Sequence, residues 1–306
     1  MYPYTGSGPY CYANSLAMML GPAAPSPSVI EVLTGSPFGL ELLAGRLPFF
    51  DPYGWDPDRG LDDAIALLGW TCHRHGADDD RPALAMLHDA VQAGPVLAGP
   101  MEIGLLRHQP DMTGPIGSDH FVCVLEVDDE LIRFHDPQGF PYATLPARDF
   151  LAAWRAETIP YQAMPYTMRS DFRRIRDTTC EAALRAALPG AVAWLRGRDD
   201  LRVPPGTVGG AAAARRLADL IAGGLDADLH DHLVYFAIKV GARRLADAAT
   251  ALAHIGRDQG AAVAARQARL VGSLQYDLVA GANQSAAKTP RQLAPTYDEL
   301  AAALAC

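Results

Sequence analysis

A cysteine at a predicted helix start is the first candidate for chemistry in this sequence. The stretch "TGSGPYCYANSLAMMLG" runs from Thr5 to Gly21, and its loop of Gly, Ser and Pro ends at Cys11, where an apolar helical pattern begins. The dipole and unpaired N–H groups of a helix N-terminus stabilise a thiolate. Cys11 is therefore a candidate nucleophile, and the alternative is a small buried hydrophobic residue.

A histidine and an aspartate are spaced to serve that thiol. A nucleophilic cysteine needs a base, and the base needs a group that orients it. His120 opens the β-rich run "HFVCVLEV", Asp136 closes the run "LIRFHD", and "DDE" between them predicts a hairpin. Because the two strands pair, both side chains are expected at the open end of the hairpin, where Asp136 can hold the imidazole in one tautomer. The alternative role for Asp136 is to cap the turn "DPQG".

The elements around these residues predict an α+β domain followed by an all-helical domain. Aromatic residues concentrate before Phe172, and alanine dominates after it. The first part gives helical patterns and then an antiparallel sheet, which is an α+β order. The predicted helices cover 14–20, 27–35, 61–69, 81–94 and 147–157, and the predicted strands cover 70–75, 95–99, 120–127, 131–136 and 142–145. We expect a domain over 1–165, a linker within 158–171, and a bundle of about five helices in a domain over 166–306.

Composition excludes several classes of function. The formal charge of −9, without a basic run, argues against a nucleic acid or an anionic membrane as partner. The five cysteines form no CxxC pair and are too sparse for a secreted disulfide scaffold. The start "MYPYTGSGPY" lacks the features of a signal peptide. We therefore expect a cytoplasmic protein with reduced thiols.

Four stretches together carry a resemblance to a known family. They are "GPYCYANSLAMMLG", "AGPVLAG", "SDHFVCVLEVDDELIRFHDPQG" and "FLAAW". This part of the chain, about the first 160 residues, resembles the papain-like fold of bacteriocin-processing leader peptidases. It is more similar still to the BtrH-like N-terminal domain, named for the acyltransferase of butirosin biosynthesis. The rest resembles the helical domain of unknown function that often follows that module.

The resemblance implies a cysteine-dependent acyltransferase of secondary metabolism that needs no cofactor and no metal. Its partners would be an acyl thioester, such as an acyl carrier protein, and an amine acceptor. The leader peptidases carry a glutamine six residues before the cysteine, and Thr5 stands there in this chain. The remaining oxyanion and substrate-pocket candidates are Tyr4, Tyr10, Asn14 and Gln138. The helical domain is expected to recognise donor or acceptor, or to form a homodimer.

Two alternatives keep the same fold but change the function. One is a cysteine peptidase or amidase with the same triad, and the other is a noncatalytic binding module. Several further motifs are predicted to be structural. Cys72 and Cys123 lie in strand patterns and are expected to be inert core residues, the HxH pairs at 73–75 and 230–232 lack a third metal ligand, and "GTVGG" before Ala211 is expected to start a helix because it lacks a GK[ST] ending.

Overall fold

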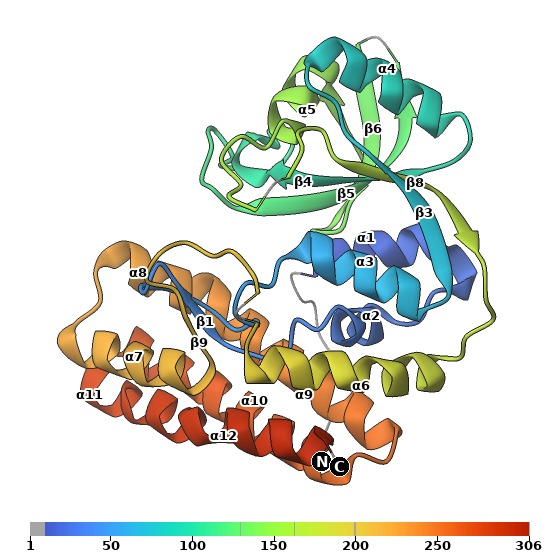
Figure 1. Ribbon diagram of the computed structural model, residues 1–306. Helices are drawn as coiled ribbons and strands as arrows, with labels where there is room; N and C mark the ends of the chain where they lie inside the picture. The colour runs from blue at the N-terminus through green and yellow to red at the C-terminus, as the bar shows by residue number, and fades with distance from the viewer. Residues whose placement is uncertain (1–9, 129, 162, 199, 306) are drawn as a thin grey trace. The chain divides into compact units, whose positions relative to one another are not determined.

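The chain folds into two compact units in the computed structural model, which describes residues 10–128, 130–161, 163–198 and 200–305 (Figure 1). The first, here called the sheet unit, comprises residues 10–27 and 69–177. The second, the helical unit, comprises residues 28–68 and 178–305. This division differs from the expected boundary between residues 165 and 166, because the segment 28–68 groups with the helices and the sheet extends beyond residue 165.

The sheet unit is built on one antiparallel sheet of six strands in the order β3-β8-β4-β5-β6-β7 (Figure 1). The α+β class with a helical region after the sheet is thereby confirmed, as are the predicted hairpin and the strand that follows it. The strands are β3 (Trp70–His75), β4 (Val96–Glu102), β5 (Asp119–Val127), β6 (Leu131–Asp136), β7 (Phe140–Pro146) and β8 (Met168–Arg174).

Helices cover both faces of this sheet. Helix α1 (Cys11–Leu20) packs along β5 and contacts β4, whereas α4 (Asp80–Val91) and α5 (Ala147–Trp154) pack on the sheet through an apolar cluster that includes Val122, Val124 and Phe134. Phe121 and Cys123 point the other way, toward α1. Since successive side chains of a strand alternate between faces, β5 separates α1 from α4 and α5.

The segment expected to be a linker, 158–171, contains the first residues of a strand inside the sheet, β8. Strand β8 pairs with β3 on one side and with β4 on the other, through pairs such as Trp70↔Arg174 and Leu97↔Arg169. Its sequence, "MRSDFRR", gives no apolar alternation, although Arg169 is fully buried. Tertiary pairing overrides weak local propensity there.

The helical unit combines a bundle of helices with a small sheet of order β2-β1-β9. Thr179 caps α6 through a bond from the Ala182 backbone N–H, which explains where that helix begins. Helix α12 is one of the long helices of this bundle and contains Pro295. The elements are α2 (Pro27–Leu33), β1 (Glu41–Leu43), β2 (Leu47–Phe49), α3 (Pro57–Leu67), α6 (Cys180–Arg196), β9 (Val208–Gly209), α7 (Gly210–Gly223), α8 (Ala227–Asp231), η3 (His232–Ala237), α9 (Ile238–His254), α10 (Asp258–Val279), α11 (Asn283–Ala286) and α12 (Lys288–Ala305).

A buried charge cluster ties the segment 28–68 to α9. Arg244 Nε donates to Glu31 Oε1 at 2.7 Å, and Arg244 Nη1 donates to Asp51 Oδ2 at 3.0 Å. One turn earlier on α9, a Cβ at Gly241 would lie 2.4 Å from the Phe50 ring, so a glycine is needed at this contact. The helical unit therefore contains a part of the chain that precedes most of the sheet.

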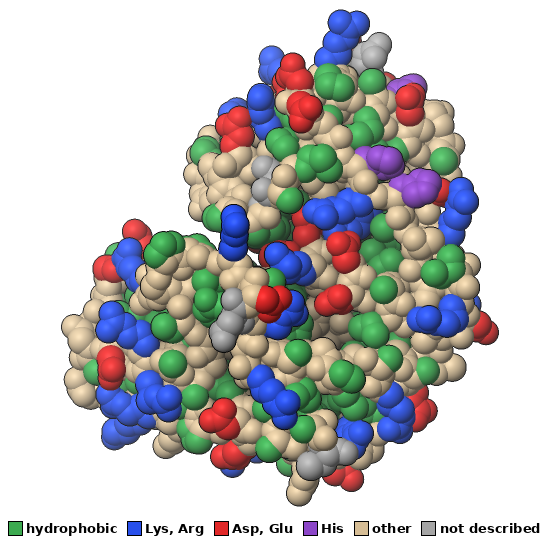
Figure 2. Space-filling view, viewed as in Figure 1, with side chains coloured by type: hydrophobic (Ala, Val, Ile, Leu, Met, Phe, Trp, Pro, Cys, Tyr) green, Lys and Arg blue, Asp and Glu red, His purple; other side chains and the backbone are tan. Residues whose placement is uncertain are grey.

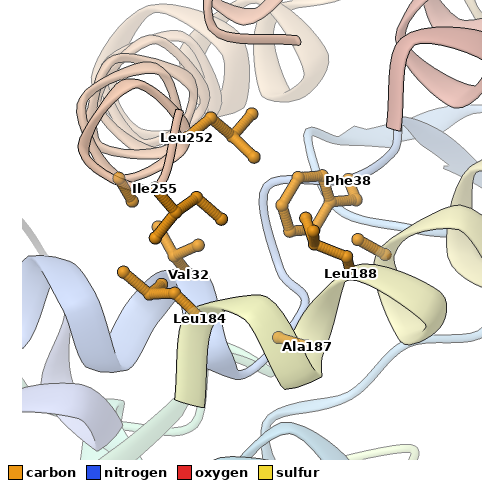
Figure 3. Close-up of a pocket in the computed structure, with 9 residues that line it drawn as sticks. Val32, Phe38, Leu184, Ala187, Leu188, Leu252 and Ile255 are labelled. Carbon is orange, nitrogen blue, oxygen red and sulfur yellow. The ribbon is translucent and has the colours of Figure 1, made fainter. Parts of the chain in front are cut away.

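A small gap lined by apolar side chains lies between α2, α6 and α9 of the helical unit. Figure 3 shows the side chains around it, including Val32, Leu184 and Leu252, and its volume is about 10 Å³. That is about the smallest space that can hold one water molecule, and an apolar gap of this kind stays dry. It is a packing defect and has no room for a ligand.

Charged side chains of both signs are interspersed over the face seen in Figure 2. Many are paired, as in Arg185 with Glu181 at 2.8 Å and Arg198 with Asp200 at 2.7 Å. Among the residues that the structure describes, no single helix is long and apolar enough to cross a membrane. The consecutive helices 11–23 and 27–33 reach that length and apolarity only as a pair.

Candidate active site

Cys11 is the first residue of α1. The chain turns into the helix at Tyr10, whose carbonyl oxygen accepts two bonds of 2.8 Å from Asn14, one from the backbone N–H and one from the side-chain amide. The Tyr10 side chain makes no capping hydrogen bond, and the first turn of α1 holds no acidic residue. The positive end of the helix dipole therefore acts directly on the Cys11 side chain.

Two contacts fix how α1 lies along β5. Ser15 Oγ donates to the Phe121 carbonyl oxygen at 3.2 Å, and the Cys123 and Met19 sulfurs are 3.6 Å apart. A four-residue step on a helix advances about 6 Å, and a two-residue step on a strand advances about 6.7 Å. Four residues of α1 therefore span about the same length as two residues of β5. Since Ser15 lies opposite Phe121, Cys11, four residues before Ser15, lies level with the start of β5, which carries His120.

His120 and Asp136 are brought together as the hairpin spacing predicts. The His120 imidazole Nε2 lies 2.8 Å from Asp136 Oδ1, and both side chains are almost fully buried. An ionised carboxylate only accepts hydrogen bonds, so the neutral imidazole donates through Nε2–H. This bond leaves Nδ1, which carries the free lone pair, as the nitrogen of His120 that can accept a proton.

The close approach of β4 helps to place His120. Gly99 has a φ of +152°, and a Cβ there would lie 2.4 Å from the Phe121 ring and 2.9 Å from the His120 carbonyl oxygen. The register between β4 and β5 shifts between Ala98 and Met101. A larger residue at position 99 would push β4 away from the strand that carries His120.

Asp136 accepts several hydrogen bonds, of which the sequence analysis predicted only the one from His120. Besides His120, it accepts bonds at 2.7 Å from His108 Nε2 and Gln109 Nε2, both at Oδ2, and a bond at 2.8 Å from the Gln138 backbone N–H at Oδ1. Burial raises the pKa of Asp136, but the bonds from His108 and His120 outweigh it and hold this pKa far below its usual range. The carboxylate therefore stays ionised throughout the working pH range of proteins.

Asp136 makes the contacts that each of its two interpretations requires. It bonds His120, and it also organises the turn "DPQG", since the Gly139 N–H donates to the Asp136 carbonyl oxygen at 3.2 Å. The backbone N–H of Gln138 closes that turn on the carboxylate. Asp136 therefore belongs both to the turn and to the candidate site.

His108 and Gln109 were missed because they lie in a loop with no periodic pattern. Residues 103–118 join β4 to β5, and this loop contains one short helix, η2 (Ile103–Leu105). The buried Glu102 gathers the ends of the loop by accepting bonds from the N–H groups of Gly104, Ile116 and Gly117 at 2.9–3.0 Å. A His-Gln pair in a loop that leads into the His120 strand was the available signal.

The remaining predicted pocket residues divide into three groups. Tyr4 and Thr5 lie outside the described residues. Tyr10 is buried and starts α1, and the Asn14 amide is held on the Tyr10 carbonyl rather than presented to a substrate. Gln138 reaches the site through its backbone N–H, which holds Asp136.

The other cysteines and histidines have individual places. Cys123 is buried, as expected, and burial raises the pKa of its thiol to about 12. Cys72 is half-buried on the edge strand β3, so the prediction that Cys72 is a core residue is wrong. His230 and His232 each contact a backbone carbonyl, of Leu278 and Pro48 respectively. Within the described part of the chain, no three His, Cys, Asp or Glu side chains are grouped to hold a metal ion.

Fold and site together define an α+β protein with a buried histidine–carboxylate cluster at the start of β5 and a cysteine at the N-terminus of the helix that packs along that strand. A family model described as the YobF C-terminal domain matches residues 204–305. The chain is also 31% identical over 251 residues to "Uncharacterized protein YobF" of Bacillus subtilis (strain 168), covering 81% of this chain and 80% of that protein. The chain belongs to the YobF family.

Proposed function

We propose that the sheet unit is a papain-like catalytic unit of BtrH type, which transfers an acyl group from a thioester to an amine. The observation that carries this proposal is the 2.8 Å bond between His120 Nε2 and Asp136 Oδ1, level with the helix start that bears Cys11. A carboxylate that fixes one imidazole nitrogen leaves the other to accept a proton from a thiol.

The chemistry proceeds in two balanced steps. His120 takes the Cys11 proton, the sulfur attacks the thioester carbonyl, and the donor thiol leaves with the proton that His120 returns. The acyl group is then bound to Cys11 as a new thioester. In the second step the amine attacks that carbonyl, His120 accepts its proton, and the Cys11 thiolate leaves and is reprotonated, which yields an amide.

Each neighbouring group has a proposed role. Asp136 keeps His120 in the Nε2–H tautomer and stabilises the imidazolium. The helix N-terminus supports the thiolate and supplies a backbone N–H to the oxyanion, assisted by Thr5 or Tyr4. The proposed donor is an acyl carrier protein or another acyl thioester, and the proposed acceptor is an amine. The proposed location is the cytoplasm. The helical unit is proposed to recognise the donor or the acceptor, or to form a homodimer.

Selective alkylation tests the activated thiol. At pH 6 an ordinary thiol is almost entirely protonated, so iodoacetamide should label Cys11 before Cys180, the exposed cysteine at the start of α6. Peptide mass mapping reads both sites in one sample. His120→Ala should remove the preference, while Cys180 labelling stays unchanged and reports reagent activity. Equal labelling of Cys11 and Cys180 in the wild-type protein would contradict the proposal.

Intact-protein mass spectrometry tests the acyl-enzyme. The protein is exposed to a panel of acyl thioesters, and the expected result is a mass increase equal to the acyl group. The adduct should be absent in Cys11→Ala, retained in Cys180→Ala and discharged by added amines. If Cys11 is the preferred alkylation site but no donor forms an adduct, acyl transfer is rejected. The conclusion that Cys11 is an activated thiol would then still stand.

The amidase alternative uses the same groups with water as acceptor. It is distinguished by product analysis, because a transferase releases an amide only when an amine is present and a hydrolase releases the free acid without one.

One observation favours the noncatalytic alternative. Phe121 and Cys123 point toward α1, so strand alternation directs His120 to the opposite face of β5. In that alternative the cluster around Asp136 only stabilises the sheet unit. His120→Ala would then lower stability without changing the relative alkylation of Cys11.

A further inference from the structure

Asp136 holds two imidazoles, and the proposed chemistry uses one of them. His120 Nε2 lies 2.8 Å from Oδ1, and His108 Nε2 lies 2.7 Å from Oδ2. The Gln138 backbone N–H also donates to Oδ1, and the Gln109 side-chain amide also donates to Oδ2. A carboxylate offers about four lone-pair sites, and these donors occupy two sites at each oxygen. His108 therefore makes up half of what holds Oδ2.

The surroundings of the His108 ring are those of an apolar side chain. The imidazole packs edge-on against Phe134 and Phe140, with ring centroids 4.9 and 5.4 Å away, and its side chain is 8% exposed. Its Nδ1 is buried and has no hydrogen-bond partner among the described residues. A phenyl ring would pack at this position without leaving a buried polar atom unpaired, which is costly. What the histidine adds is the bond from Nε2 to Asp136.

The loop that carries His108 is held in place by other contacts. The buried Glu102 fixes both ends of this loop through three backbone N–H groups. Within the loop, the Gln109 backbone N–H donates to the Leu106 carbonyl oxygen at 2.9 Å, and the Leu106 side chain is fully buried in the apolar cluster. His108 therefore reaches Asp136 from a loop that is already anchored. It follows that the bond orients the carboxylate rather than the loop.

We propose that His108 is a positioning residue, whose Nε2–H holds Asp136 Oδ2 so that Oδ1 faces the Nε2–H of His120. The terminal torsion of an aspartate side chain has broad energy minima, and hydrogen bonds weaken steeply when they are misaligned. A carboxylate held at both oxygens therefore keeps His120 in one tautomer and one orientation. The consequence for Cys11 rests on the proposed function, because His108 acts on the thiol only through Asp136 and His120.

Three variants of His108 distinguish its hydrogen bond from its packing. His108→Phe keeps an aromatic ring at this apolar position and removes the donor. His108→Met also removes the donor, and its flexible side chain adapts to the space if the phenyl ring does not fit. His108→Gln loses the ring, but its amide nitrogen can take the place of Nε2. His135→Phe is the matched control, because His135 precedes Asp136 on β6 and accepts a bond from the Tyr142 backbone N–H at 3.1 Å instead.

NMR of the full chain with isotope-labelled histidine measures the bond between His120 and Asp136. The ring N–H signal that is missing from His120→Ala belongs to His120. Exchange of this N–H with water should be at least about tenfold faster in His108→Phe and His108→Met than in the wild type, because the acceptor is no longer held in line. It should stay within about threefold of the wild type in His108→Gln and in His135→Phe.

Two results would overturn the proposal. Unchanged or slower exchange of the His120 N–H in the variants without a donor would show that its bond to Asp136 does not depend on His108. Exchange in His108→Gln as fast as in His108→Phe would show that packing of the ring, and not its N–H, is what matters.

Alkylation at pH 6 then tests whether the positioning extends to Cys11. The preference of iodoacetamide for Cys11 over the exposed Cys180 should fall at least about tenfold in His108→Phe and should persist in His108→Gln. A preference that His108→Phe leaves intact would overturn the link from His108 to Cys11, while the proposed function would stand. No preference in the wild-type protein would reject the proposed function, and the exchange rates would still decide whether His108 positions Asp136.

Discussion

Replacing Asp136 with asparagine tests the cluster at the start of β5 most directly. Asp136 accepts bonds from His120 and Gln138 at Oδ1 and from His108 and Gln109 at Oδ2. Asparagine has the same shape, but one of its two terminal atoms is an NH₂ donor. In either orientation of the amide, two of the four donors meet another donor.

The expected loss of stability follows from that count. Leaving a buried donor without its acceptor costs about 1–3 kcal/mol, so two of them cost about 2–6 kcal/mol. The other two bonds persist but lose the charge of the acceptor, which adds to the loss. Asp136→Asn should therefore lower the free energy of unfolding by about 3–6 kcal/mol at pH 7. Since domains are stable by about 5–15 kcal/mol, a loss of this size is a large part of the total and is measurable in urea.

Urea unfolding at pH 7 and at pH 3 measures the effect. The pKa of Asp136 is lowered by folding, and a carboxyl of this kind stabilises the protein above its unfolded pKa, about 3.9. The gap between wild type and variant should be complete at pH 7 and should shrink as pH falls below about 4. Asp128→Asn is the control, because Asp128 is exposed on the same hairpin and accepts backbone bonds from Glu130 and Leu131. The reasoning fails if Asp136→Asn costs no more than Asp128→Asn, or if the gap is the same at both pH values.

Three further outcomes are expected. Arg244→Met should lower the free energy of unfolding by about 3–5 kcal/mol in urea titrations, because it leaves two buried carboxylates without their cation. Burial raises the pKa of Glu41 to about 8, so wild-type stability should fall as pH rises from 5 to 8. Thermal unfolding at both pH values should show that Glu41→Gln removes this fall. Cys123, whose thiol pKa is raised to about 12 by burial, should remain unlabelled by iodoacetamide at pH 9 while Cys180 is labelled, as read by peptide mapping.

The sequence by itself determined what depends on neighbours along the chain. The β5–β6 hairpin follows from two alternating runs around a short polar turn, and so the approach of His120 to Asp136 could be predicted from spacing. The start of α1 at Cys11 follows from a loop that ends where an apolar helical pattern begins. The α+β class and the helical second half follow from the same local periodicities.

Only the tertiary structure decided how distant segments share a sheet, a core or a carboxylate. Strand β8 has a polar sequence and becomes a strand because β3 and β4 pair with both of its edges. The segment 28–68 joins the helices because Glu31 and Asp51 need Arg244, a cation 213 and 193 residues further along the chain, when all three are buried. His108 and Gln109 reach Asp136 from an irregular loop. Strand pairing between distant segments and the hydrogen bonding of buried polar groups depend on which surfaces come into contact. The periodicity of a sequence does not specify those contacts.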